Sequence, residues 1–427
     1  MQKSRGRIPG PRPLNRRQGI GGELNYDPGT SHFGLMKTAR SPLKPQGRDP
    51  MKDQGENAAP GPAVTAEESI ARAWTLPASV YLDAATAARE KEQIFSRTWQ
   101  IVARSAQLRQ PNDFVTTELC GEPLLLTRNE RGELRAFYNV CRHRAGPPAE
   151  GCGNRKVFRC GYHGWTYSSD GHLLHAPEME GTENFRTEDF GLRPVRVTEW
   201  SGLVFVNLGD RALPLPLALG EIPRQAAKFG FERMRLHERR EYVMECNWKT
   251  YIDNYLEGYH LPSVHPGLNR ELDYSQYTTE LFPGYSLQWS PIRGAENEKS
   301  APRRYRLDDA PAAPGALLRA EYYWVFPNWM LNCYPDNVSL NIVLPLGEER
   351  CVAIFEWYFG EAQMSGGVPA ETVAFSDEIQ REDGRICETV QRNLRSRSYQ
   401  RGRYSVKQET ALYHFHSLYK EMMESGG

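Results

Sequence analysis

The chain has 427 residues, and its 53 lysines and arginines balance its 53 aspartates and glutamates, so its formal net charge at pH 7 is zero. Such a chain has no overall field that would attract nucleic acid or an anionic membrane surface. No run of about 18 apolar residues is available to cross a bilayer, and the eight cysteines do not form the dense framework of a small secreted domain. We therefore expect a cytoplasmic protein without nucleic-acid or membrane partners, long enough for two domains.

Residues 1–65 differ in composition from the rest of the chain. Up to Lys52 they contain eleven Lys or Arg and only three acidic residues, together with many Pro and Gly. This composition predicts a disordered basic tail. The pair Arg16-Arg17 is not followed by the apolar segment of an export signal, and the three prolines before it exclude the amphipathic helix of a mitochondrial presequence.

Three folded segments are expected after the tail. Over residues 66–100, Asp83 can cap a helix that continues to about Trp99, so this segment is predicted to be helical. Residues 101–210 contain short apolar runs that alternate with turn residues, which predicts a small antiparallel β domain. Residues 220–427 mix helical and strand patterns and predict a larger second domain.

The larger domain is expected to contain an antiparallel sheet flanked by helices. A first helix is predicted from Asn247 to Tyr259, strands at 322–327, 339–344 and 352–359, and a second helix at 372–396. The predicted fold class is therefore α+β.

Two Cys and His pairs in the small β domain have the spacing of a metal site. One residue separates Cys141 from His143, two residues separate Cys160 from His163, and each pair lies at the edge of an expected hairpin. Two thiolates and two imidazoles can bind one zinc ion, or the two irons of a Rieske [2Fe-2S] cluster, one iron through sulfur and the other through nitrogen. The spacing and the sequence from Gly161 to Tyr167 are similar to oxygenase-type Rieske loops, which favours the cluster over zinc.

A second constellation lies on the first helix of the larger domain. Helical spacing includes Asn254, Glu257 and His260, and Pro262 is expected to end the helix, so that His265 follows beside the same helix end. Two histidines around a helix break can turn toward a common point. Non-haem Fe(II) oxygenases bind their metal with two histidines and one carboxylate, and they leave positions open for O2 and substrate.

The third ligand must come from another part of the chain. On the helix predicted at 372–396, Ile379, Asp383 and Ile386 share one apolar face. A carboxylate on such a face needs compensation, because a buried unpaired charge is costly, and a bound metal would provide it. Asp383 is the expected ligand; Asp377 is the alternative, although its position suits the first turn of the helix.

From about Tyr81 to Arg403 the chain resembles the α subunits of the Rieske non-haem iron ring-hydroxylating oxygenases. Both constellations, Asn247-Trp248-Lys249 and Glu382-Asp383 carry the resemblance. It implies an N-terminal antiparallel-β Rieske domain and a C-terminal catalytic domain. The implied cluster ligands are Cys141, His143, Cys160 and His163, and the implied ligands of a mononuclear Fe(II) are His260, His265 and Asp383.

The resemblance implies a terminal oxygenase that uses O2 to hydroxylate a small organic substrate. No Gly-x-Gly-x-x-Gly loop follows a predicted strand, so NAD(P)H is expected to act only indirectly, through a separate flavin or iron-sulfur reductase, with or without a ferredoxin. The non-enzymatic alternative is a Rieske electron carrier, which would hold the cluster irons and lack the mononuclear iron.

Glu257 is implied to take part in catalysis, together with the nearby Asn254. In the family, the acidic residue at this position bridges a Rieske histidine of one subunit to an iron-bound histidine of the next, which implies a head-to-tail homotrimer. Ring dioxygenases usually have Asp there, whereas Glu is similar to the branch that oxidises carnitine or choline-type compounds. Gly258 departs from the Cys of the carnitine-type motif. A quaternary-ammonium monooxygenase is therefore the alternative function.

An aromatic-rich segment bears on the choice between an aromatic and a quaternary-ammonium substrate. Its rings either form a cage that holds a cation over their faces or belong to the core. These residues are Tyr322, Tyr323, Trp324, Phe326 and Trp329.

Overall fold

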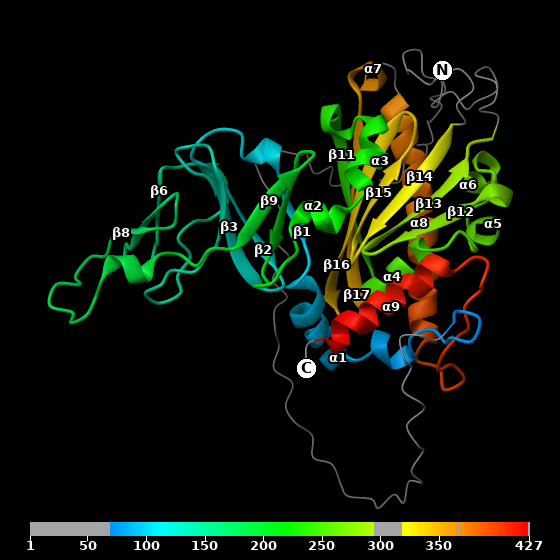
Figure 1. The fold of residues 1–427 in the computed structure, drawn as a ribbon, viewed down its shortest axis with the longest axis horizontal. Helices are drawn as coiled ribbons and strands as arrows, with labels where there is room; N and C mark the ends of the chain where they lie inside the picture. The colour runs from blue at the N-terminus through cyan, green and yellow to red at the C-terminus, as the bar shows by residue number, and fades with distance from the viewer. Residues whose placement is uncertain (1–68, 294–317, 365–367, 426–427) are drawn as a thin grey trace, which may run out of the picture.

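The computed structural model describes residues 69–293, 318–364 and 368–425, and the tail expected over residues 1–65 lies outside these ranges. Within them no helix is both long and apolar enough to cross a membrane. A smaller β-rich part lies beside a larger part in which helices flank a sheet (Figure 1). This arrangement confirms the predicted α+β class.

A short helical segment precedes the smaller domain. It consists of η1 (Ala78–Tyr81), α1 (Ala84–Glu90) and the π-helical η2 (Lys91–Phe95). Asp83 caps α1, because its carboxylate accepts a hydrogen bond from the main-chain N–H of Thr86 at 2.8 Å.

The smaller domain contains three antiparallel sheets with the strand orders β1-β10-β9, β4-β3-β2-β5 and β6-β7-β8. The last of these lies at the end of the molecule farthest from the larger domain (Figure 1). The strands are β1 (Gln100–Arg104), β2 (Asp113–Leu119), β3 (Glu122–Arg128), β4 (Leu134–Tyr138), β5 (Cys152–Asn154), β6 (Val157–Arg159), β7 (Thr166–Ser168), β8 (Leu173–His175), β9 (Arg196–Trp200) and β10 (Leu203–Asn207), with short helices η3 (Ser105–Gln107) and η4 (Thr187–Phe190).

The larger domain is built on one seven-stranded antiparallel sheet with the order β11-β17-β16-β15-β14-β13-β12. Its strands are β11 (Arg235–Met244), β12 (Thr278–Phe282), β13 (Tyr285–Pro291), β14 (Arg319–Val325), β15 (Trp329–Cys333), β16 (Asn337–Gly347) and β17 (Arg350–Phe359). Its helices are α2 (Leu215–Leu219), α3 (Ile222–Ala226), η5 (Ala227–Phe229), η6 (Phe231–Arg233), α4 (Trp248–Tyr255), α5 (Leu261–Val264), α6 (Pro266–Glu271), η7 (Tyr274–Gln276), α7 (Glu361–Met364), α8 (Val368–Asn393) and α9 (Thr410–Glu424).

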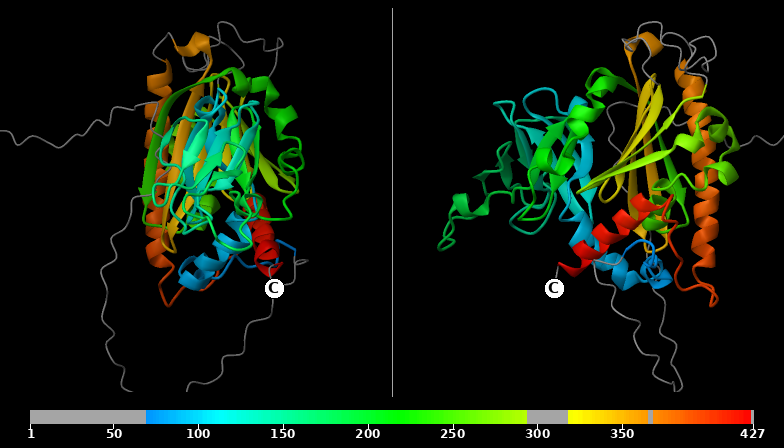
Figure 2. Two further views of the ribbon diagram at one scale, coloured as in Figure 1. Left: turned by 90° about the vertical axis from the view of Figure 1, so that its left-hand side faces the viewer. Right: turned by 45° about the vertical axis from the view of Figure 1, so that its right-hand side comes forward.

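The seven-stranded sheet is covered on both faces. One face packs on β1, β10, α2 and α3 in a continuous apolar cluster. The other face packs against α4, α8 and α9 in a second cluster, and Figure 2 shows α8 running along this side of the sheet. Because successive residues of a strand point to opposite faces, each central strand sends alternate side chains toward the helices.

The helix expected from Asn247 to Tyr259 is shorter than predicted. It begins after Asn247, whose side chain caps α4, but it ends at Tyr255. The side chain of Glu257 then turns back, and its Oε2 accepts the main-chain N–H of His260 at 3.0 Å. Pro262 lies in the first turn of α5 rather than at a helix end, a position where its missing N–H is not needed.

A buried ion pair connects α4 to both ends of the folded chain. Lys249 Nζ lies 2.6 Å from Glu90 Oε1, and both side chains are almost completely buried. The same carboxylate accepts hydrogen bonds from the indole of Trp248 at 2.8 Å and from the hydroxyl of Tyr419 at 2.7 Å. Glu90 thus links α1, α4 and α9, and it holds the helix that leads into the His260 segment.

We expect Lys249→Met to lower the free energy of unfolding by about 3–5 kcal/mol, because it leaves the carboxylate of Glu90 buried without its cation. The double variant Lys249→Met/Glu90→Gln is expected to lose less, since it removes both charges. Urea unfolding of the iron-loaded proteins measures both. A single variant as stable as the double variant would show that Glu90 does not depend on Lys249.

Candidate active site

The two Cys–His loops have the same main-chain structure. The N–H of Cys141 donates to the carbonyl of Gly146 at 2.9 Å, and the N–H of Cys160 donates to the carbonyl of Trp165 at 2.8 Å. In each loop the residue four positions after the cysteine donates back to that cysteine's carbonyl at 3.0 Å. The loops also pack closely, since a Cβ at Gly146 would lie 2.8 Å from Cys160 Sγ. Two similar turns therefore present two thiols and two imidazoles together.

In these loops the two cysteines are buried and the two histidines are exposed. Cys141 and Cys160 are buried, whereas His143 and His163 are exposed, with their ring centroids 4.5 Å apart. Burial raises the pKa of the Cys160 thiol. Desolvation and the neighbouring His143 lower the pKa of His163, which favours the neutral ring that binds metals.

This arrangement fits a two-iron cluster better than one zinc ion. Three or more His, Cys, Asp or Glu residues can form a group whose ligand atoms all lie within 4.8 Å of one another. Among the described residues, the only such group is in the larger domain. The four loop residues are not such a group. A pair of thiols at one end and a pair of imidazoles at the other is the ligand set of a Rieske cluster.

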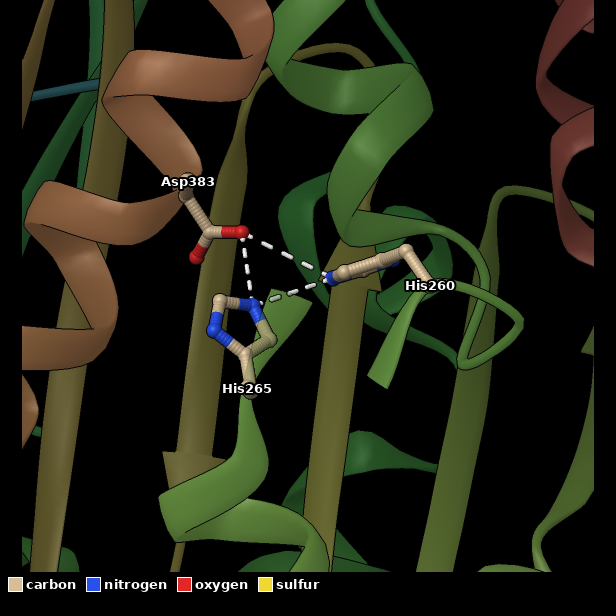
Figure 3. Close-up of side chains that lie close together, drawn as sticks. All are labelled: His260, His265 and Asp383. Atoms are coloured by element: carbon tan, nitrogen blue, oxygen red, sulfur yellow. Dashed lines mark hydrogen bonds and ion pairs between the residues drawn. The ribbon is translucent and has the colours of Figure 1, made fainter. Parts of the chain in front are cut away.

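The converging group consists of His260, His265 and Asp383, which α8 and the segment around α5 bring together (Figure 3). His265 Nε2 lies 3.1 Å from His260 Nε2 and 2.9 Å from Asp383 Oδ1. His260 Nε2 lies 3.6 Å from the same carboxylate oxygen. Two imidazoles and one carboxylate on one side of a common point fit a mononuclear Fe(II) with open positions.

Each histidine is oriented by a second carboxylate. Glu257 Oε1 lies 2.7 Å from His260 Nδ1, and Glu382 Oε2 lies 2.7 Å from His265 Nδ1. A proton on each Nδ1 leaves each Nε2 with a lone pair toward the common point, which is the arrangement found behind metal-binding histidines. Asn254 donates from Nδ2 to Asp383 Oδ1 at 2.6 Å.

The sequence did not indicate a role for Glu382. It is the neighbour of Asp383 in the sequence, and adjacent residues on a helix point in different directions. The alternative ligand Asp377 is not near the histidines. Its carboxylate accepts from Tyr242 at 2.7 Å and pairs with Arg240 and Arg381, each at 2.8 Å.

The charges of the triad perturb its pKa values strongly. Burial lowers the pKa of His260, but Asp383 and Glu257 outweigh burial and raise it to about 10. Burial raises the pKa of Asp383, but the two histidines outweigh it and lower the value to about 2. The pKa of His265 is also raised, because Asp383 and Glu382 outweigh burial. Without a metal, at least one of the two imidazoles therefore carries a second ring proton and is cationic at neutral pH.

A cavity of about 110 Å³ lies beside the triad, between the sheet and α4, α6 and α8. Among the described residues that line it, none is Lys or Arg, and the only carboxylates are those of Glu257 and Asp383. Eight aromatic side chains contribute to its wall. The aromatic lining residues are Tyr251, Tyr255, Tyr277, Tyr322, Tyr334, Phe355, Trp357 and Phe375.

The five aromatic residues considered as a cage divide between cavity and core. Tyr322 lines the cavity. Tyr323 and Trp329 are buried on the opposite face of the sheet, and Trp324 is buried against α4 and α9 with Phe326 packed beside it. Strand alternation separates Tyr322 from Tyr323, so a contiguous aromatic run cannot form one wall.

Comparisons with protein families agree with the two-part architecture. Residues 98–186 match the Rieske [2Fe-2S] domain, and residues 231–425 match the catalytic domain of the ring hydroxylating alpha subunit. Choline monooxygenase of Arabidopsis thaliana is 34% identical over 82% of this chain and 83% of its own length. The carnitine monooxygenase oxygenase subunit of Escherichia coli K12 is 30% identical over 82% of this chain and 94% of its own length.

Solved structures show the same relation. The quaternary ammonium Rieske monooxygenase CntA, whose structure is described in terms of carnitine oxidation and inter-subunit electron transfer, has a TM-score of 0.71 and 27% identity over 83% of this chain and 96% of its own. Naphthalene 1,2-dioxygenase has a TM-score of 0.64 at 19% identity over 85% of this chain and 96% of its own. The second likeness concerns the fold alone.

We expect Asp383→Ala to lose the mononuclear iron and keep the cluster, because it removes one of three ligands and no residue of the cluster loops. Asp377→Ala, on the same helix, is the matched control and is expected to keep both. Iron analysis with the visible spectrum of the cluster measures the result, about two irons per chain for the first variant and about three for the second. Loss of the mononuclear iron from the Asp377 variant alone would contradict the assignment.

Iron binding to the metal-free triad is expected to strengthen with pH. Because the pKa of His260 is about 10, the ring is protonated at neutral pH and must lose this proton when the metal binds. The affinity for Fe(II) should therefore rise about tenfold per pH unit between pH 6 and 9. Anaerobic titration of chelator-treated protein tests this, and an affinity independent of pH would show that no proton is displaced.

Proposed function

Since the chain belongs to the Rieske ring-hydroxylating oxygenase α subunits, and is therefore a terminal oxygenase that depends on a separate electron-transfer partner, we propose that its substrate is a small quaternary ammonium compound. The reaction would consume O2, two electrons and two protons, place one oxygen atom in a C–H bond next to nitrogen or oxygen, and release the other as water. Hydroxylation of an N-methyl group yields an N-hydroxymethyl ammonium, whose C–N bond then breaks to release formaldehyde, a tertiary amine and a proton. Hydroxylation of an alcohol carbon yields a hydrated aldehyde.

The cavity beside the triad is the observation that carries this proposal. A quaternary ammonium has no N–H to donate, so it is bound chiefly by aromatic faces and negative charge. The cavity offers eight aromatic residues and two carboxylates, and no Lys or Arg among its described lining residues. Cation–π attraction contributes about 2 kcal/mol or more when the cation is desolvated. The relatives named for choline and carnitine oxidation support the same class of substrate.

We assign the residues of the catalytic domain as follows. His260, His265 and Asp383 would hold the iron, which supplies O2 activation when bound. Glu257 and Glu382 orient the two imidazoles. The aromatic walls hold the substrate and exclude water from the reacting carbon.

We further propose that the electrons cross between subunits of a head-to-tail homotrimer. The cluster loops lie between β4 and β7, far from α4 and α8 within one chain (Figure 1), and this separation disfavours transfer within a chain. His163, in a cluster loop, is exposed. Tyr259, which precedes the iron-ligand candidate His260, is 57% exposed, so both sites approach the protein surface. Glu257 would then connect His260 to His163 of a neighbouring subunit.

The electron source we propose is a flavin or iron-sulfur reductase that oxidises NAD(P)H, with or without a ferredoxin. A reducing, cytoplasmic location is supported by the cysteines. None of the eight forms a disulfide in the described structure, and disulfides are rare in that compartment.

The test measures O2 uptake by the iron-loaded protein supplied with a surrogate reductase. Quaternary ammonium compounds are expected to raise the rate at least about tenfold over the substrate-free rate, because the substrate fills the aromatic cavity beside the triad. Formaldehyde or an aldehyde should form in proportion to the O2 consumed. Aromatic acids and hydrocarbons form the comparison panel. A phenol or diol from that panel, with no response to quaternary ammonium compounds, would make the chain a ring hydroxylase instead.

Glu257→Gln is expected to keep both metals and lower turnover about a hundredfold, because it removes the charge that supports the imidazole of His260. Glu257→Asp keeps the charge and serves as the matched variant, which should retain more activity. Iron analysis and the rate at which the reduced cluster is reoxidised by O2 with substrate measure both effects. Wild-type reoxidation in the Gln variant would contradict a role for Glu257 in electron transfer.

A further inference from the structure

The floor of the cavity is formed by one face of β16. Asn337, Ser339 and Asn341 alternate along this strand with apolar residues that pack on the opposite face of the sheet, and all three line the cavity. A strand in the centre of a sheet rarely carries three polar side chains on a buried face without a ligand or partner for them.

Asn341 differs from the other polar groups of this wall. Its side chain is completely buried, and within the described part of the protein neither its Nδ2 nor its Oδ1 has a hydrogen-bond partner. By contrast, Asn332 on the next strand accepts from the hydroxyl of Tyr255 at 2.7 Å. The residues paired with Asn341 across the sheet are Met330 and Phe355, which offer no side-chain hydrogen bond. One donor and one acceptor are thus presented to the cavity unpaired.

A buried carboxamide without hydrogen-bond partners lowers the stability of the folded protein. A bound molecule that pairs with it removes this cost, which favours binding. The proposed substrates have two ends of different chemistry. The ammonium end suits the aromatic wall, and the other end of choline-like or betaine-like compounds carries oxygen. A hydroxyl can donate to Oδ1 and accept from Nδ2, whereas a carboxylate can only accept from Nδ2.

We propose that Asn341 is a specificity-determining residue that hydrogen-bonds the oxygen-bearing group of the quaternary ammonium substrate. The inference rests on the proposed function and adds to it the requirement for a second polar group on the substrate. It predicts that the protein distinguishes compounds with this group from tetramethylammonium, which has the cation alone. A site that hydrogen-bonds its ligand discriminates strongly against an analogue that lacks the group.

The test compares Asn341→Leu, which is similar in size and cannot hydrogen-bond, with the wild-type holoenzyme. Binding of tetramethylammonium, choline and glycine betaine is measured by anaerobic calorimetry. We expect Asn341→Leu to weaken the better-bound oxygenated ligand about tenfold or more, and to leave tetramethylammonium within about twofold of wild type. Whether choline or glycine betaine binds better to wild type identifies the group as hydroxyl or carboxylate.

Ser286→Ala is the matched control. Ser286 is also buried, and its hydroxyl also has no partner among the described residues, but it does not line the cavity. This variant should bind all three ligands as wild type does. Asn341→Ala serves as a second variant if the leucine disturbs folding, and the same differential loss is expected.

Equal weakening of all three ligands by the Asn341 variants, or no weakening of any, would overturn the inference and leave the proposed function intact. Failure of the wild-type protein to bind any of the three would instead overturn the proposed function, and the inference with it. The two failures are distinguished because one appears only in the variants and the other already in wild type.

Discussion

The catalytic domain depends on one electrostatic constraint, the convergence of two imidazoles on a buried carboxylate. Asp383 comes from α8 and the histidines from the segment around α5, more than a hundred residues earlier in the chain. The carboxylate keeps a pKa of about 2 only because His260 and His265 face it. The rest of the domain maintains this contact. Glu257 and Glu382 hold the rings from behind, and the buried Glu90–Lys249 pair holds α4.

Local sequence patterns predicted much of this site. The Cys–His pairs were predictable because each pair lies within one turn. Asp383 was predictable because a charge on an apolar helical face needs a partner. The family comparisons bear out the two metal-containing domains. Pro262 was interpreted as a helix end, which was wrong, because proline is also accepted in a first turn. The helix break lies before His260, and the two histidines flank the short helix α5.

Contacts between distant elements could not be predicted. Glu382 supports His265 from α8, and neither residue carries a local signal for the other. The residues that form the cavity wall could not be predicted either. Tyr322 and Trp357 lie in one row across the sheet only because β14, β15, β16 and β17 are neighbours in that order, and strand order is set by long-range packing rather than by local pattern. The role proposed for Asn341 could not be predicted from sequence, because it depends on which groups surround its side chain in the folded protein.

The central claim is that a cluster and a mononuclear iron held by different subunits act as one catalytic unit. Mixed trimers of Cys160→Ser chains, which keep the triad, and Asp383→Ala chains, which keep the cluster, test it most directly. Each variant alone should be inactive. In a head-to-tail ring assembled at random from equal amounts, about a quarter of the subunit contacts join an intact cluster to an intact triad, so about a quarter of wild-type turnover should return. No recovery in mixed trimers that hold both metals would show that electrons pass within a chain, and would contradict the account.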